Sequence, residues 1–445
     1  MTRTSPLDDL ATVHGRLEET RLTTEALAAP LSESDQTVQS MPDTSPTKWH
    51  RAHTTWFFET FVLGEHLPGY TPFDEHFSYL FNSYYEGVGD RYPRVRRGLV
   101  TRPGIERIAE YRRHVDRGLH ALIDGADREL AAVITPLLDL GVHHEQQHQE
   151  LLLMDIKHVL ENNLFDTAYD ARRHTPVADP GPIRWRSIEG GLVAIGFDDE
   201  VPDQPPFHFD NEEPRHDALV PSFRLADRLV TCGEWLAFMA DGGYETATLW
   251  LSDGWHKSRS EGWTAPLYWH QDHDGQWMIH TLTGRRPIDP NEPVCHVSFY
   301  EADAYANWAG ARLPTEFEWE RASTEPQTAG ATLAHHQPDG PSTVSLSRLH
   351  PDGAGAPSDA PDGGPVLRQL TGDCWEWTGS PYRPYPGFRA ADGAIGEYNG
   401  KFMINTMVLR GGCALTPAGH LRPTYRNFFH PHTRWHLSGV RLAND

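Results

Sequence analysis

The stretch LAAVITPLLDLGVHHEQQHQELLLMDIKHVLENNL, residues 130–164, carries the longest helical hydrophobic periodicity in this chain of 445 residues. Its apolar residues recur every three to four positions, which is the spacing of one face of an α-helix. The same spacing predicts further helices over residues 7–31, 56–63 and 105–123. The segment Thr101-Arg102-Pro103 is typical of a helix start with proline in the first turn. Several helices of this length predict an amino-terminal helical bundle over residues 1–173.

The texture of the sequence changes after a polar, proline-containing stretch at residues 174–187, which we interpret as a linker. From residue 188 to 445 the segments are short and rich in Gly, Pro, Trp and Tyr, and glycine pairs predict turns. Helix-like patterns persist near residues 231–240 and 300–309. Residues 323–366, dominated by Ala, Gly, Pro, Ser and Asp, predict a long surface loop.

The charge balance excludes several classes of function. Acidic residues outnumber basic ones by 62 to 39, and the formal net charge is -23. A surface of this sign repels nucleic-acid phosphates and anionic lipids, so we expect neither partner. No apolar run is long enough to span a membrane, and the segment MTRTSPLDDL lacks the apolar core of a secretory signal. The four widely spaced cysteines form no CxxC pair, which favours a cytoplasmic location without disulfides.

Two histidines in HHEQQHQE, residues 143–150, are spaced for one helix face. His144 and His148 are four positions apart, so their side chains lie about 6 Å apart along the helix axis, and neighbouring leucines place them on the inward side. Two imidazoles converging inside a bundle suit a divalent metal, although a pair of hydrogen-bonded core histidines has the same spacing. His143 is a weaker candidate because its own i+4 position holds glutamine.

A third metal ligand must come from elsewhere in the chain. The segment WHRAHTTWFF, residues 49–58, is rich in histidine and aromatic residues, and we expect His53 at the beginning of an inward-facing helix. His50 better fits a surface or capping role. Alternative carboxylate ligands are Glu145, Glu150 and Asp155, of which the two glutamates are rotated away from the histidine pair. Three histidines with open positions suit iron that activates oxygen, and equally zinc.

A tandem tyrosine, Tyr84-Tyr85, lies between these two histidine segments. A phenol near a metal can donate a proton or an electron, so either residue is a candidate catalytic group. Core packing is the alternative interpretation of the pair. Neighbours in an extended chain usually point in different directions, and Tyr85 is the slightly better candidate.

Four motifs occur in order in the second half of the chain. They are RLPTEFEWE (312–320), GDCWEWT (372–378), LRGG (409–412) and GVRL (439–442). The series resembles the formylglycine-generating-enzyme and sulfatase-modifying-factor family, which implies a C-type-lectin-like domain over residues 188–445. The paired active-site cysteines of the sulfatase-modifying enzymes match Thr416 and Leu421 here, so formylglycine generation is not expected.

The whole chain resembles the ergothioneine-biosynthetic sulfoxide synthases, in which a DinB-like helical bundle with three histidines precedes such a domain. The resemblance is carried by SMPD (40–43), SPTKWH (45–50), FNSYY (81–85) and NGKFM (399–403), and is closest to the branch that uses free cysteine. It implies an α+β fold and a non-haem iron(II), O2-dependent enzyme. The implied reaction joins the sulfur of a thiol to the imidazole of hercynine (trimethylhistidine) and gives a hercynine–cysteine sulfoxide.

The resemblance also implies roles for single residues. Fe(2+) is expected on His53, His144 and His148, with Tyr84 or Tyr85 as the phenol. The implied substrate-binding residues are Gln147, Asn427 and Phe428, with Phe429 beside them. An aromatic face can bind a trimethylammonium group by a cation–π contact, although the two phenylalanines can equally be core residues. Arg434 is a candidate to hold a carboxylate, with a surface salt bridge as the alternative.

Three departures from the family pattern bear on the sulfur donor. Cys413 stands where serine is usual, Cys374 where valine is usual, and Asn405-Thr406 replaces a more typical Asn-Gln. If these residues shape the donor pocket, the donor differs from cysteine; neutral drift is the alternative. The selenoneine synthases, which join a selenosugar to hercynine, have the same architecture and are an alternative function. A thiol dioxygenase and a non-catalytic ligand-binding module with structural zinc are two others.

Overall fold

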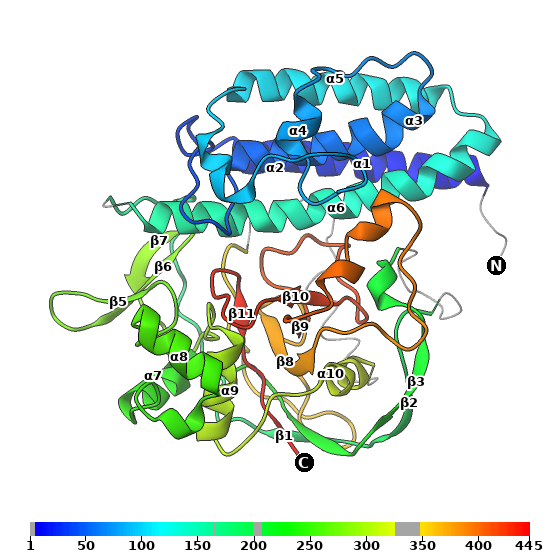
Figure 1. Cartoon of the computed structure of the whole chain (residues 1–445). Helices are drawn as coiled ribbons and strands as arrows, with labels where there is room; N and C mark the ends of the chain where they lie inside the picture. The colour runs from blue at the N-terminus through cyan, green and yellow to red at the C-terminus, as the bar shows by residue number, and fades with distance from the viewer. Residues whose placement is uncertain (1–4, 164, 199–206, 325–347) are drawn as a thin grey trace.

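The computed structural model describes residues 5–163, 165–198, 207–324 and 348–445. A helical bundle forms one side of the molecule, and a mixed half of short strands and helices forms the other (Figure 1). The helices of the bundle are α1 (Pro6–Ala28), α2 (Thr47–Phe58), α3 (Gly64–His66), α4 (Phe77–Phe81), α5 (Ile105–Asp124) and α6 (Arg128–Glu161). Helix α6 runs along the boundary between the halves (Figure 1), so its residues can face both.

The bundle helices follow local capping chemistry. Helix α1 begins after Ser5, whose side chain accepts a hydrogen bond from the backbone N–H of Leu7. Helix α6 begins after Asp127, whose carboxylate accepts the backbone N–H groups of Glu129 and Leu130. Its apolar repeat buries one side against α1 and α2 and confirms the predicted helix over residues 130–161. The last predicted residue, 164, lies outside the described residues.

Two expected helix starts are wrong. Helix α5 begins at Ile105 after Gly104, so the segment Thr101–Pro103 lies before the helix rather than in its first turn. The helix expected over residues 56–63 is the end of α2 and a π-helical turn, Glu59–Leu63. Because α2 begins at Thr47, His53 lies in the middle of that helix and not at its beginning.

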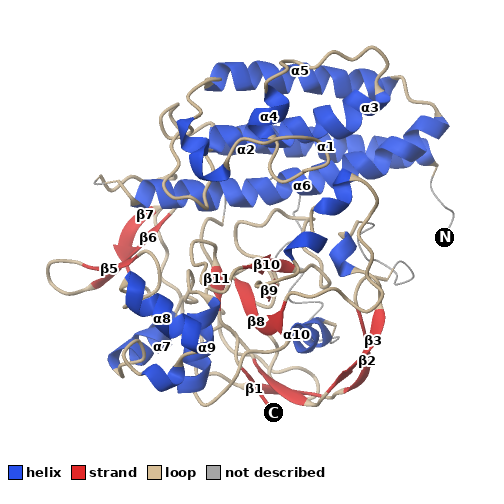
Figure 2. Ribbon diagram, viewed as in Figure 1, coloured by secondary structure: helices blue, strands red, loops and turns tan. Residues whose placement is uncertain are grey.

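The carboxy-terminal half is built from short elements joined by long loops (Figure 2). Its strands are β1 (Trp185–Ile188), β2 (Gly191–Ile195), β3 (His216–Val220), β4 (Phe223–Ala226), β5 (Trp269–Gln271), β6 (Trp277–Thr281), β7 (Gly284–Pro287), β8 (Trp375–Pro381), β9 (Met407–Arg410), β10 (Asn427–Phe429), β11 (Ser438–Gly439) and β12 (Ala443–Asn444). Its helices are α7 (Cys232–Ala240), α8 (Ser252–Glu261), α9 (Phe299–Trp308) and α10 (Glu316–Ser323). The α+β class is confirmed.

Within the described residues the strands form four small sheets, with orders β1-β4-β12, β10-β9-β8-β11, β2-β3 and β5-β6-β7. In the second of these, β10 pairs antiparallel with β9, and Asn427 lies opposite Leu409. Strand β1 starts at Trp185, inside the stretch interpreted as a linker, and pairs with β4. The surface loop expected over residues 323–366 is described only in part, because residues 325–347 lie outside the described residues. Residue 323 is the last of α10, and residues 348–366 lie in no named helix or strand.

Buried ion pairs hold the sequence motifs of this half. Arg426, which lies outside the motifs, pairs with Glu316 of the first motif. Arg410 of the third motif pairs with Glu320 of the first, and Arg441 of the fourth pairs with Glu376 of the second. In the last of them, the Arg441 Nε and the Glu376 Oε2 are 2.8 Å apart and both side chains are fully buried. Removing one partner of such a pair typically costs about 3–5 kcal/mol, because it leaves an uncompensated charge. The motifs therefore hold together a domain that has little regular structure.

The two halves share one hydrophobic core. Leu152, Leu153 and Ile156 of α6 belong to the same buried cluster as Trp375 and Trp435 of the carboxy-terminal half. The face of α6 opposite the bundle is therefore packed against the other half. Among the described residues, no helix is long and apolar enough to cross a membrane.

Candidate active site

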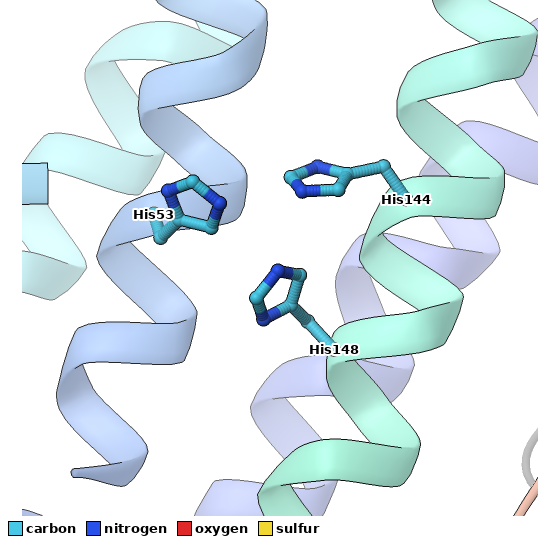
Figure 3. A group of neighbouring side chains, drawn as sticks. All are labelled: His53, His144 and His148. Carbon is cyan, nitrogen blue, oxygen red and sulfur yellow. The ribbon is translucent and has the colours of Figure 1, made fainter. Parts of the chain in front are cut away.

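Three histidines from two helices converge inside the bundle (Figure 3). His53 comes from α2, His144 and His148 come from α6, and one ligand nitrogen from each lies within 4.8 Å of the others. Their exposed fractions are 0, 4 and 7%. Gly141, one turn before His144, lets the helices approach closely, because a Cβ there would lie 2.3 Å from the Phe58 ring.

The ring nitrogens of the cluster suit a metal. His53 Nδ1 donates to the carbonyl of Phe81 at 2.6 Å, which leaves Nε2 with its lone pair and without a hydrogen-bond partner. Both ring nitrogens of His144 are buried and likewise have no hydrogen-bond partner among the described residues. Buried polar atoms without partners are rare, and an imidazole lone pair is a ligand that divalent transition metals favour. The three residues therefore fit a metal centre.

Burial keeps these imidazoles neutral. It lowers the pKa of His144 to about 4. It also lowers the pKa values of His53 and His148 well below the usual range, and the positive charge of a protonated neighbour adds to the effect. Metal binding requires the deprotonated nitrogen, so at neutral pH no proton has to be displaced from the cluster.

The sequence suggested a surface or capping role for His50, and this expectation is wrong. His50 is buried, and its Nδ1 lies 2.8 Å from His148 Nδ1. Its Nε2 lies 2.9 Å from the Asp155 carboxylate. Asp155, an alternative ligand in the sequence analysis, therefore contacts the cluster only through His50.

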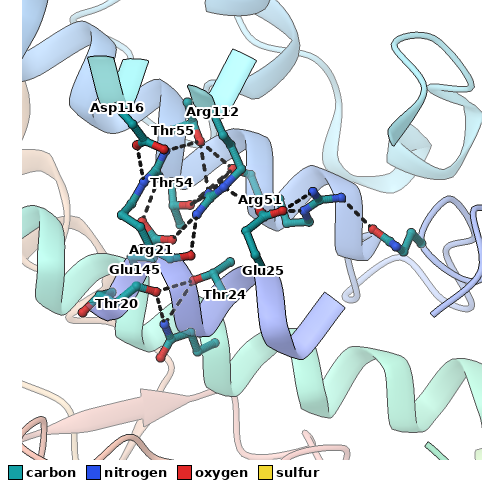
Figure 4. A network of polar contacts seen from close by, with 12 residues as sticks. Thr20, Arg21, Thr24, Glu25, Arg51, Thr54, Thr55, Arg112, Asp116 and Glu145 are labelled. Carbon is teal, nitrogen blue, oxygen red and sulfur yellow. Dashed lines mark hydrogen bonds and ion pairs between the residues drawn. The ribbon is translucent and has the colours of Figure 1, made fainter. Parts of the chain in front are cut away.

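The two glutamates considered as ligands face other partners. Glu145 binds Arg21 at 3.0 Å and Arg112 at 2.9 Å on the bundle side of α6 (Figure 4). Burial alone would raise the pKa of Glu145, but the two guanidinium groups lower it to about 2. Glu150 accepts hydrogen bonds from Trp375 at 2.7 Å and from Thr416 at 2.6 Å, and its burial raises its pKa.

Two cavities lie at the interface between the halves, and His144 of the cluster lines the first of them. The first has a volume of about 680 Å³, and its lining includes Arg16, Phe57, Tyr85, Asp139, His144 and Phe207. The second has a volume of about 260 Å³, and its lining includes Tyr84, Glu150, Asn427, Phe428, Phe429 and Trp435. Gln147, Phe209, Tyr398 and Asn399 line both.

Gln147 is held between the cavities by two tyrosines. Tyr398 donates its hydroxyl to Gln147 Oε1 at 2.7 Å, and Gln147 Nε2 donates to the Tyr425 hydroxyl at 2.8 Å. Gln147 is one helix turn from His144 and one residue from His148. A molecule bound in either cavity can therefore contact this amide close to the histidine cluster.

The tandem tyrosines point to different cavities. Tyr85 lines the first cavity together with His144, and its ring lies 5.6 Å from that of Trp56, which stacks on His53. Tyr84 lines the second cavity, 5.7 Å from the ring of Tyr398. Burial raises the pKa of Tyr84 to about 12 and that of Tyr85 well above its usual range, so both are protonated donors at neutral pH.

The remaining expected substrate residues divide into two groups. Asn427, Phe428 and Phe429 all line the second cavity, with Phe428 stacked on Tyr382 at 4.2 Å. Arg434 lines neither cavity. Its guanidinium lies 3.4 Å from Glu301 and over the Trp263 ring, and it also donates to a backbone carbonyl.

Several residues at the site gave no sequence signal. Tyr398, Tyr425 and Trp435 lie outside the regular elements, far from the histidines in sequence, and no local spacing marks them. The two unusual cysteines line neither cavity. Cys374 is buried beside Leu229. Cys413 is hydrogen-bonded to the Thr416 hydroxyl, which donates to Glu150, a lining residue of the second cavity.

Comparisons with known proteins agree with this two-part architecture. A family model for the sulfatase-modifying factor enzyme 1-like domain matches residues 184–445, and one for the DinB superfamily matches residues 16–159. A hercynine oxygenase of Mycolicibacterium thermoresistibile is 36% identical over 76% of this chain and 75% of its own length. That of Mycobacterium tuberculosis is 33% identical over 91% of this chain and 92% of its own. A formylglycine-generating enzyme of Streptomyces coelicolor is 27% identical over 60% of this chain and 93% of its own length.

Proposed function

Because the chain belongs to the hercynine oxygenase family of ergothioneine biosynthesis, we propose that it uses iron(II) and O2 to join the sulfur of a thiol to the imidazole of hercynine. The thiol we propose is cysteine, and the product is a hercynine–cysteine sulfoxide. The observation that carries the proposal is the convergence of three buried imidazoles, one of which, His144, lines a cavity that shares Gln147 with a second cavity.

The ligand set proposed for iron is His53, His144 and His148. Three neutral nitrogens on one side leave other coordination positions open, as oxygen-activating iron requires. Iron bound there would activate O2 and would hold the donor as a nucleophilic thiolate.

The second cavity suits hercynine. Its aromatic lining, which includes Phe429, Tyr425 and Trp435, offers ring faces to a trimethylammonium group, a contact of about 0.5–2 kcal/mol. Gln147, the residue before His148, lines the same cavity and has an amide that can bond to an imidazole nitrogen. Both ends of the substrate therefore find a chemical partner.

The first cavity suits the sulfur donor. His144 is among the residues that line it, and it shares the Gln147 side chain with the proposed hercynine cavity. Two substrates held on either side of Gln147 would have their reacting atoms close together, so that a bimolecular coupling becomes effectively intramolecular. The phenol of Tyr85 lies in the same cavity and can donate a proton at the reacting atoms.

One observation favours a larger donor as a second candidate. The first cavity, about 680 Å³, falls within the range of about 300–1,000 Å³ typical of drug-sized ligands, which is more room than cysteine needs. A selenosugar, as in the selenoneine synthases, would use this room. Asp139 and Arg16, which form an ion pair at 2.8 Å on the cavity wall, are polar partners for such a donor.

A competition assay tests the proposal. Anaerobically purified, iron-loaded protein is given hercynine with cysteine, γ-glutamylcysteine and a selenosugar together, and O2 uptake and products are followed by mass spectrometry. Coupled hercynine–cysteine sulfoxide is the expected product. Sulfinic acid without coupling would make the protein a thiol dioxygenase, and no O2 uptake with any donor would favour a non-catalytic binding module.

A further inference from the structure

His148 differs from the other two histidines of the cluster in how its ring is held. His53 is oriented by a backbone carbonyl, and His144 has no hydrogen-bond partner in the described part of the chain. His148 is oriented by a side chain, because its Nδ1 lies 2.8 Å from Nδ1 of the buried His50. The nitrogen of His148 that remains for the cluster is therefore Nε2 (Figure 3).

The direction of this hydrogen bond follows from Asp155. Its carboxylate accepts the backbone N–H of Ser45 at 2.8 Å and the indole N–H of Trp435 at 3.2 Å. A carboxylate only accepts hydrogen bonds, so His50 Nε2, at 2.9 Å, is the donor to it. In neutral His50 the other nitrogen, Nδ1, then carries the lone pair.

The proton on His148 is fixed by the same reasoning. Because His50 Nδ1 is an acceptor, His148 Nδ1 must carry the proton that joins them. The lone pair of His148 is then on Nε2, toward His53 and His144. Ligand histidines of metal centres are often held in one tautomer by a carboxylate beyond them, and loss of such a partner typically lowers metal affinity about 10–100-fold.

We propose that His50 and Asp155 are positioning residues of the metal centre, which select the Nε2-ligating tautomer of His148. The inference rests on the proposed metal site but not on the reaction that the site catalyses. Asp155 also holds Trp435, a wall of the second cavity, so one carboxylate supports both a metal ligand and a substrate cavity. The carboxy-terminal half thereby contributes to the metal centre of the bundle.

The first experiment measures metal affinity. His50→Phe keeps a flat ring and removes both nitrogens, and His143→Phe is the matched control, a buried histidine on α6 whose ring nitrogens face His420 and Arg16 instead. Cobalt(II) binding to the metal-free full chain is measured by competition with a chelator, and the visible spectrum of the bound ion is recorded. We expect about 10–100-fold weaker binding and an altered spectrum for His50→Phe, with neither change in the control.

A second variant and a second measurement guard against misfolding. Asp155→Asn keeps the volume of the side chain, and melting of the metal-free proteins shows that each variant folds. In the zinc-loaded wild type, two-bond 1H–15N spectra should show His148 protonated at Nδ1 and metal-bound at Nε2. Wild-type affinity in both variants, or zinc on His148 Nδ1, would overturn the inference.

The outcomes separate this inference from the proposed function. If the wild type binds cobalt tightly, the variants bind it weakly and no hercynine coupling occurs, then the positioning role stands and the proposed reaction fails. If coupling occurs and the variants bind metal as the wild type does, then the reaction stands and the positioning role fails.

Discussion

His144 and Glu145 are adjacent on α6 but face different surroundings (Figures 3 and 4). His144 faces the histidine cluster, whereas the Glu145 carboxylate is bound by two arginine side chains. Both side chains are buried, with exposed fractions of 4 and 0%. Glu145 receives bonds from Arg21 and Arg112, whereas the ring of His144 receives none. A satisfied polar network stabilises the fold, and an unsatisfied one is a site prepared for a ligand.

The two regions therefore respond to different perturbations. Removing a partner from the arginine network leaves a buried charge without compensation, which destabilises the folded chain. Removing His144 from the cluster takes away a buried ring that has no hydrogen-bond partner among the described residues. Stability should thus depend on the first region and metal binding on the second.

The largest effect on stability is expected for Glu145→Ala. It leaves Arg21 and Arg112 buried without their shared carboxylate, so the free energy of unfolding should fall by about 3–5 kcal/mol. Urea denaturation of the metal-free chain measures the change. Asp116→Ala is the control, because it removes the partly exposed partner of Arg21 and should cost only about 1 kcal/mol or less. Equal losses of unfolding free energy in the two variants would contradict the proposed difference between the buried and the partly exposed carboxylate.

The largest effect on metal binding is expected for His144→Ala or His148→Ala. Each removes one of the three proposed ligands, so metal affinity should fall by more than the roughly 100-fold that loss of an outer partner can cause. Metal analysis after anaerobic loading with iron(II) gives the occupancy. The carboxy-terminal half should stay folded, as near-UV circular dichroism would show. Full iron occupancy in either variant would remove that residue from the ligand set.

A smaller effect is expected from pH on the metal-free protein. Burial lowers the pKa of His144 to about 4, so below the usual pKa of about 6.5 the unfolded chain binds a proton that the folded chain does not. Stability should therefore fall as the pH falls from 6.5 toward 4, by up to about 1.4 kcal/mol per pH unit for this residue. Urea midpoints of wild type and His144→Ala measure the slope, which should be shallower in the variant.

The tandem tyrosines allow the cluster to be tested without removing a ligand. Tyr85→Phe should slow coupling by about tenfold or more and raise the share of oxidised, uncoupled thiol, because the phenol in the cavity of His144 is lost. Tyr84→Phe should have a weaker effect, since Tyr84 lines the other cavity. Sulfoxide and sulfinic acid are quantified for both variants and for the double variant. Wild-type partitioning in the double variant would return both residues to packing roles.

The smallest effect is expected for the two unusual cysteines. Cys374 and Cys413 are fully buried and line neither cavity, so Cys374→Val with Cys413→Ser should leave the preference among donors unchanged. The competition assay with cysteine, γ-glutamylcysteine and a selenosugar measures that preference. A shifted ratio would mean that the donor contacts the second cavity, on which Cys413 acts through Thr416 and Glu150, and would contradict the assignment of the donor to the first cavity.

The sequence by itself determined the features that repeat along the chain. The spacing of apolar residues defined α1, α5 and α6 because a helix places every third or fourth side chain on one face. The same geometry placed His144 and His148 together, and the four ordered motifs indicated the carboxy-terminal fold. Each of these features depends on residues close in sequence or on a linear order.

Only the tertiary structure decided which residues meet across elements. His50 and Asp155 are 105 positions apart, and nothing in their local sequence indicated that they share a hydrogen bond. The same holds for the bonds of Gln147 to Tyr398 and Tyr425, which span 251 and 278 positions. Such contacts arise when α6 packs against both halves of the molecule, because burial forces each polar group to find a partner wherever the fold provides one.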